Sequence, residues 1–92
     1  MNDKDLKQDV LDVTSQLEYA NRLTKRENKM TAILRRLRAG EPYDLDMSIR
    51  AAMIHADASE GLRLYSETPE ITERAKRVKE LCRQIRAYEK PQ

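Results

Sequence analysis

The residue types that most often carry chemistry are scarce in this chain of 92 residues. His55 is the only histidine and Cys82 the only cysteine, and no second ligand stands at a metal-binding spacing from either. Cys82 lies among apolar residues at helical spacing, which predicts a buried and unreactive thiol. With only two glycines, the sequence also lacks a glycine-rich loop that could cradle phosphate. We therefore expect a non-enzyme with no catalytic residues, no metal, no cofactor and no small-molecule substrate.

A basic stripe is the sharpest charged feature of the sequence. Four of its residues recur at the spacing of one helix face, and a further arginine, one turn past Ile33, extends it: Arg22, Lys25, Arg26, Lys29 and Arg36. Such a stripe can follow the phosphates of a nucleic acid, or it can meet acids of another protein or of this chain. The net charge of only +2 and the absence of interleaved aromatic residues favour a solvated or protein-facing stripe.

The charges fall into bands of alternating sign. Residues 1–21 carry five acids and two bases, residues 22–40 seven bases and one acid, residues 41–70 seven acids and two bases, and residues 71–92 seven bases and three acids. These bands can match one another when helices of the same chain pair, or when two copies pair in antiparallel.

The elements that position these charges are helices. Residues 4–39 contain neither glycine nor proline, and their apolar residues follow helical spacing until Gly40 and Pro42. We predict one helix over about 4–39. The alternative is a break near Thr24, where Glu27 would complete a capping box.

The second helix is expected over about 46–65, where Ala52 and Ala56 widen an apolar face on which another helix can pack closely. One pattern competes with this interpretation. Residues 43–49 alternate apolar and polar side chains, which is the period of a half-buried strand. The alternative fold is therefore a short strand at 43–49 followed by two helices.

The third helix is expected over about 69–88. Thr68 offers an N-cap hydroxyl, and Pro69 suits the first helical position. Glu70 and Glu73 each stand four residues before an arginine, Arg74 and Arg77, in the favourable order for an ion pair.

The predicted fold is all-α, with a long N-terminal helix and a two-helix hairpin forming a single domain over residues 1–92. The longest apolar run has four residues, Ala51 to Ile54, against about 20 for a membrane span. A single cysteine favours a reducing compartment. We expect a cytoplasmic protein without a membrane contact.

The first helix is longer than the predicted hairpin. The part that extends past the hairpin needs a packing partner, because an isolated helix is only marginally stable in water. A second copy is the simplest cover, since two-fold dimers are the commonest assemblies. We therefore predict a homodimer through Leu6, Val10, Val13 and Leu17. The alternative is a segment that frays alone and folds on a partner.

The functional hypothesis is a small protein-binding module that acts as an adaptor, modulator or inhibitor of a larger protein, through exposed faces of its first and third helices. The first alternative is a dimeric regulator that contacts nucleic acid phosphates through the basic stripe. The second is a structural component of a larger assembly. The sequence does not identify the protein partner.

Overall fold

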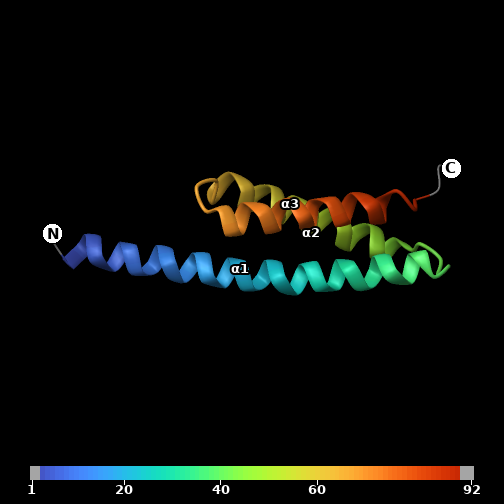
Figure 1. Ribbon diagram of the computed structural model, residues 1–92, viewed down its shortest axis with the longest axis horizontal. Coiled ribbons are helices and arrows are strands. Elements are labelled where there is room, and N and C mark those ends of the chain that lie inside the picture. The colour runs from blue at the N-terminus through green and yellow to red at the C-terminus, as the bar shows by residue number, and fades with distance from the viewer. Residues whose placement is uncertain (1–2, 90–92) are drawn as a thin grey trace.

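The computed structural model describes the backbone of residues 3–89 and the side chains of residues 13–89, and three helices make up the fold (Figure 1). Helix α1 spans Asp3–Arg38, α2 spans Leu45–Leu64 and α3 spans Pro69–Arg86. Residues 3–89 contain no strand, which confirms the all-α prediction of a long helix followed by a hairpin.

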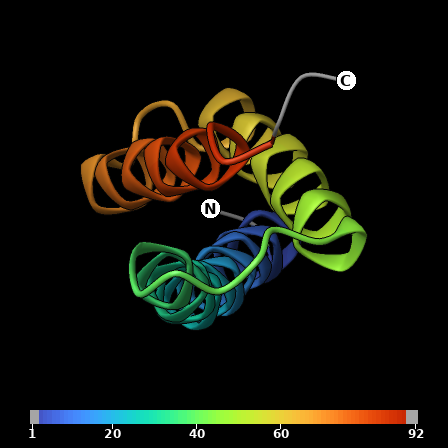
Figure 2. The same cartoon turned by 90° about the vertical axis from the view of Figure 1, so that its right-hand side faces the viewer.

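The three helices form an elongated bundle whose longest dimension is 59 Å. Helix α2 runs back along the C-terminal part of α1, and α3 returns in the direction of α1 (Figure 1). Seen along the long axis, the helices stand at the corners of a triangle (Figure 2). Helix α3 packs extensively against both other helices, whereas α1 and α2 touch more sparingly.

Helix α1 is continuous through Thr24, so the alternative of a break there is wrong. The Thr24 hydroxyl donates to the carbonyl oxygen of Ala20 at 3.0 Å, a bond within the helix, and no cap forms. The helix ends at Arg38, and the chain turns at Gly40, whose φ of 100° lies in the left-handed region that glycine adopts without a steric penalty.

The start of α2 explains why the strand alternative over 43–49 is also wrong. The Asp44 carboxylate accepts a hydrogen bond from the backbone N–H of Met47 at 2.8 Å and so caps the helix. Thr68 holds the corresponding position before α3, but its side chain makes no capping bond. Instead, its carbonyl oxygen accepts from the backbone of Ile71 and Thr72.

The core lies between the three helices and, among the described side chains, begins at Tyr19. Of residues 13–18, only Gln16 is even half-buried. The buried side chains of α1 are Tyr19, Leu23, Met30, Ile33, Leu34 and Leu37; those of α2 are Met47, Ala51, Ile54 and Ala58; those of α3 are Ile71, Ala75, Val78, Cys82 and Ile85.

Candidate interaction surfaces

The basic stripe of α1 meets an acid of its own chain. Asp57, on α2, forms ion pairs with Arg26 and, at 3.6 Å, with Arg22. The Arg22 guanidinium also lies over the ring of Tyr19, 5.0 Å from its centroid. The half-buried Arg26 therefore serves to join α1 to α2.

The other stripe residues divide into two kinds. Arg36 pairs with Glu41 at 2.7 Å, in the loop that follows α1. Lys25 and Lys29 are exposed and pair with no acid among the side chains of residues 13–89. Two of the five stripe residues thus have no acidic partner among the described side chains.

Tyr19 anchors the contact between α1 and the end of the hairpin. Its hydroxyl donates to the carbonyl oxygen of Asp57 at 2.8 Å, and its ring stacks on Tyr65 with centroids 5.1 Å apart. Burial, together with the nearby Asp57 carboxylate, raises the pKa of Tyr19 to about 12. Sequence reasoning missed this residue, although it stands one turn before Leu23 on the same helix face.

A second cross-helix contact corrects the expected ion pairs within α3. Arg74 and Arg77 reach α1, where they pair with Glu27 at 3.5 and 3.3 Å, rather than pairing with Glu70 and Glu73. Glu27 is largely buried, with 19% of its side chain exposed. These pairs and the Asp57 pairs fix α1 against both hairpin helices.

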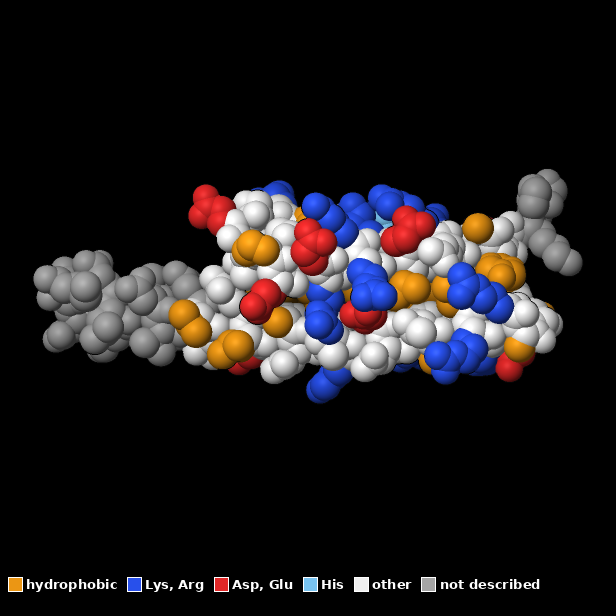
Figure 3. Space-filling model, in the orientation of Figure 1, with side chains coloured by type: hydrophobic (Ala, Val, Ile, Leu, Met, Phe, Trp, Pro, Cys, Tyr) orange, Lys and Arg blue, Asp and Glu red, His pale blue; other side chains and the backbone are white. Residues whose placement is uncertain are grey.

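The part of α1 before Tyr19, which we call the overhang, extends past the hairpin (Figure 1). Val13 and Leu17 are 56% and 61% exposed there. Hydrophobic side chains are visible on this stretch of α1 (Figure 3). Leu6 and Val10, also predicted at the dimer interface, have side chains outside the described residues.

The exposed side chains of the overhang lie on a different face of α1 from the core. Leu17 precedes Tyr19 by two residues, which places them about 200° apart around a helix of 3.6 residues per turn. Val13 lies four residues before Leu17 and shares its face. The hairpin therefore cannot cover these two side chains, whatever its length.

A second apolar surface lies on the outer side of α2, and we call it the α2 strip. Leu45, Ile49 and Met53 are 74%, 50% and 67% exposed, and Ala52 between them and Ala56 beyond them are exposed as well. The expectation that Ala52 and Ala56 receive a neighbouring helix is wrong, because α1 and α3 pack on the opposite face, where Ala51 and Ala58 lie.

Basic residues also line one face of α3, and we call them the α3 ridge. They are spaced i, i+3, i+7 and i+10: Lys76, Lys79, Arg83 and Arg86. The ridge lies beside His55 of α2. Burial lowers the pKa of His55, and the positive charges of Lys79, Arg83 and Arg86 lower it further. The spacing was visible in the sequence, but its position beside α2 was not.

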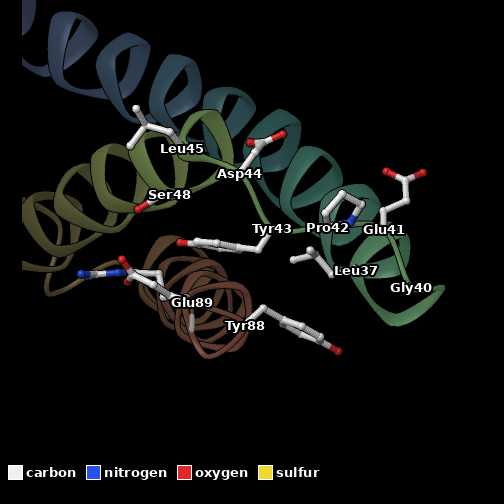
Figure 4. A pocket seen from close by; sticks show the side chains of 11 residues that line it. Leu37, Gly40, Glu41, Pro42, Tyr43, Asp44, Leu45, Ser48, Tyr88 and Glu89 are labelled. Atoms are coloured by element: carbon white, nitrogen blue, oxygen red, sulfur yellow. The ribbon is translucent and has the colours of Figure 1, made fainter. Parts of the chain in front are cut away.

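A hollow at the end of the bundle is lined by the loop between α1 and α2 and by the residues after α3 (Figure 4). Tyr43 points inward from the loop, and its buried hydroxyl has no hydrogen-bond partner in the described part of the chain. Glu89, the last described residue, also lines this hollow.

The described residues hold no cluster of side chains that could bind a metal ion. None of the helices within them has an apolar stretch long enough to cross a bilayer. The sequence matches no known protein family and no curated protein, and the fold matches no solved structure.

Proposed function

We propose that this protein is a homodimeric protein-binding module of the cytoplasm, which acts without catalysis as an adaptor, modulator or inhibitor of a larger protein. The observation that carries the proposal is the exposure of Val13 and Leu17 on a helix that continues past its own hairpin. In the sequence, Leu6 and Val10 continue the same four-and-three spacing toward the N-terminus.

Physical chemistry supports a second copy as the cover of the overhang. When an equivalent face of a second copy buries regularly spaced apolar side chains, the pair is stabilised by about 25 cal/mol per Å² of buried apolar surface. An antiparallel arrangement suits the charge bands. It separates the two basic segments over residues 22–40, whereas a parallel pair would place them side by side.

The ion pairs that the basic stripe forms within the chain favour a protein partner over nucleic acid. Asp57 and Glu41 already pair with three of its five residues, Asp57 being shared by Arg22 and Arg26. Lys25 and Lys29 remain, which is few for a stripe that must follow a phosphate backbone.

The test is the molar mass in solution, measured by size-exclusion chromatography with light scattering. We expect the wild-type protein at twice the chain mass of 10.8 kDa. Substituting both Val13→Asp and Leu17→Asp should yield a monomer, because the charges must be desolvated to pair the overhangs. Ser15→Asp, an exposed change on another face of the same helix, is the matched control and should remain a dimer. A monomeric wild type, or a dimeric double variant, would contradict the proposal.

A further inference from the structure

The α2 strip is a continuous apolar surface on the side of α2 that faces away from the core. Leu45, Ile49 and Met53 follow one another at intervals of one turn. Ala52 lies between them and Ala56 beyond them, and their small side chains leave room for a neighbouring helix. From Leu45 to Ala56 the strip runs for roughly 16 Å, or about three helical turns. It therefore has the length and shape to receive a short helix.

On one side, the α3 ridge borders the strip. Arg74 and Arg77 reach Glu27 of α1 from one side of α3, and the ridge lies on the opposite side of that helix. Helix α2 packs against α3 there, and Lys79, Arg83 and Arg86 lie near enough to His55 to lower its pKa. Within the described residues, Arg83 is the only ridge residue with an ion pair, and its partner Glu80 is a neighbour on the same helix. This edge is therefore positive.

On the other side, α1 borders the strip. Arg22 and Arg26 reach Asp57 of α2, and Lys25 and Lys29 follow each of them by three residues on the same face of α1. The acids of α2 at this edge already have partners, since Asp57 is paired with α1 and Asp46 with Arg50 at 2.8 Å. An apolar centre thus lies between two edges with surplus positive charge.

We propose that the α2 strip is the docking site for an amphipathic helix of another protein, which lays its apolar side chains on the strip and presents flanking acids to the α3 ridge and to Lys25 and Lys29. This inference rests on the proposed protein-binding role and names the chemistry of its partner. The apolar contacts supply the affinity, and the charges at both edges set the orientation and exclude basic helices.

Other occupants fit less well. Nucleic acid would place its phosphates against exposed leucine, isoleucine and methionine, and the strip has no aromatic side chain on which a base could stack. The acidic segment over residues 1–21 of a second copy has suitable chemistry, but the proposed dimer already uses it to cover the equivalent segment of its partner.

The experiment measures fluorescence anisotropy of two labelled synthetic peptides on the full chain. Each peptide is an amphipathic helix of about five turns with one leucine face, flanked by glutamate in the first peptide and by lysine in the second. We expect the glutamate peptide to bind at least about tenfold more tightly. Replacing both Ile49→Glu and Met53→Glu should weaken it by about tenfold or more, because the added acids oppose those of the peptide.

Two further variants sharpen the test. Replacing both Lys79→Glu and Arg83→Glu should remove or reverse the preference for the glutamate peptide while the strip stays intact. Leu64→Glu is the matched control, since Leu64 is a 57% exposed leucine of α2 that lies two turns beyond Ala56, and affinity should not change. The molar mass of the Ile49→Glu, Met53→Glu variant should equal that of the wild type, so loss of docking is distinguished from loss of the dimer.

Three outcomes would overturn the inference. Equal affinity for both peptides, or unchanged binding by the strip variant, would exclude docking on the strip. Tighter binding of a peptide of residues 1–20 of this chain, with the same dependence on Met53, would assign the strip to a second copy. Binding of a short DNA duplex that depends on Lys79 and Arg83 but not on Met53 would assign the ridge to nucleic acid.

Discussion

At the scale of single residues, the contact between Tyr19 and Gly61 decides how closely α1 and α2 approach. A Cβ atom at Gly61 would overlap the Oη and Cζ atoms of Tyr19. The ring cannot easily move aside, because its hydroxyl is bonded to the carbonyl oxygen of Asp57 and its face is stacked on Tyr65. Gly61 is therefore required by the space that the tyrosine ring fills, although alanine is the better helix former.

Gly61→Ala should lower the free energy of unfolding. Alanine gains up to about 1 kcal/mol of helix propensity. Displacing the ring loses the hydrogen bond, worth about 1 kcal/mol, and adds overpacking of about 1–3 kcal/mol. We expect a net loss of about 1–3 kcal/mol, measured by urea denaturation. In a Tyr19→Ala background the same change should be stabilising, and a stabilising effect in the wild-type background would refute this account.

At the scale of elements, α1 has two parts with different surroundings. From Tyr19 onward it is held by a buried apolar face and by ion pairs to both neighbours, through Glu27 to α3 and through Arg26 to α2. Before Tyr19 the described side chains contribute nothing to the core. Within the later part, Arg26 has an acidic partner on α2, and Lys29 has none among the described side chains, so the two should differ in their effect on stability.

Arg26→Glu and Lys29→Glu make the same change in net charge with different expected results. Arg26 is 30% exposed and paired with Asp57, so Arg26→Glu removes an attraction and adds a repulsion. We expect a loss of about 1 kcal/mol or more. Lys29→Glu should change the free energy of unfolding by less than about 0.5 kcal/mol, because Lys29 is exposed and unpaired within the described chain. Thermal denaturation of both variants checks this, and equal effects would argue against a structural role for Arg26.

At the scale of the whole molecule, two apolar surfaces of the described part of the chain remain open after the bundle has formed. The overhang lies at one end of the long axis, and the α2 strip lies along the side of the hairpin. Ion pairs at Asp57 and Glu27 join oppositely charged bands within the chain. Acids remain in the sequence of the overhang, and bases remain beside the strip. This separation allows one surface to join two copies while the other receives a partner.

An antiparallel dimer through the overhangs should be considerably longer than the 59 Å of one chain, because the two hairpins then lie at opposite ends. Small-angle X-ray scattering of the wild-type protein measures this maximum dimension directly. The Val13→Asp, Leu17→Asp monomer provides the reference curve. A dimer whose maximum dimension stays near that of the monomer would indicate parallel pairing and contradict the argument from the charge bands.

Local sequence patterns were enough to predict the three helices and most of the core. Helices form through contacts between residues three and four apart, so apolar spacing, Gly40, Pro42 and Pro69 sufficed to place their ends to within two residues. The buried residues of α1 from Leu23 to Leu37 and the apolar face of α3 followed from the same spacing. The first helix extends past the hairpin as expected, but Val13 and Leu17 are exposed because they lie on a different face of α1 from the core.

The tertiary structure alone decided which charges pair and which faces stay open. Glu27 pairs with Arg74 and Arg77 across 47 and 50 residues of sequence, and Asp57 pairs with Arg26 across 31. Ala52 and Ala56 differ from Ala51 and Ala58 only in the side of α2 that they occupy, yet the first two are exposed and the others buried. The reason is physical: local spacing defines the faces of a helix, but the positions of its neighbours, set by packing among distant residues, select the face that is buried.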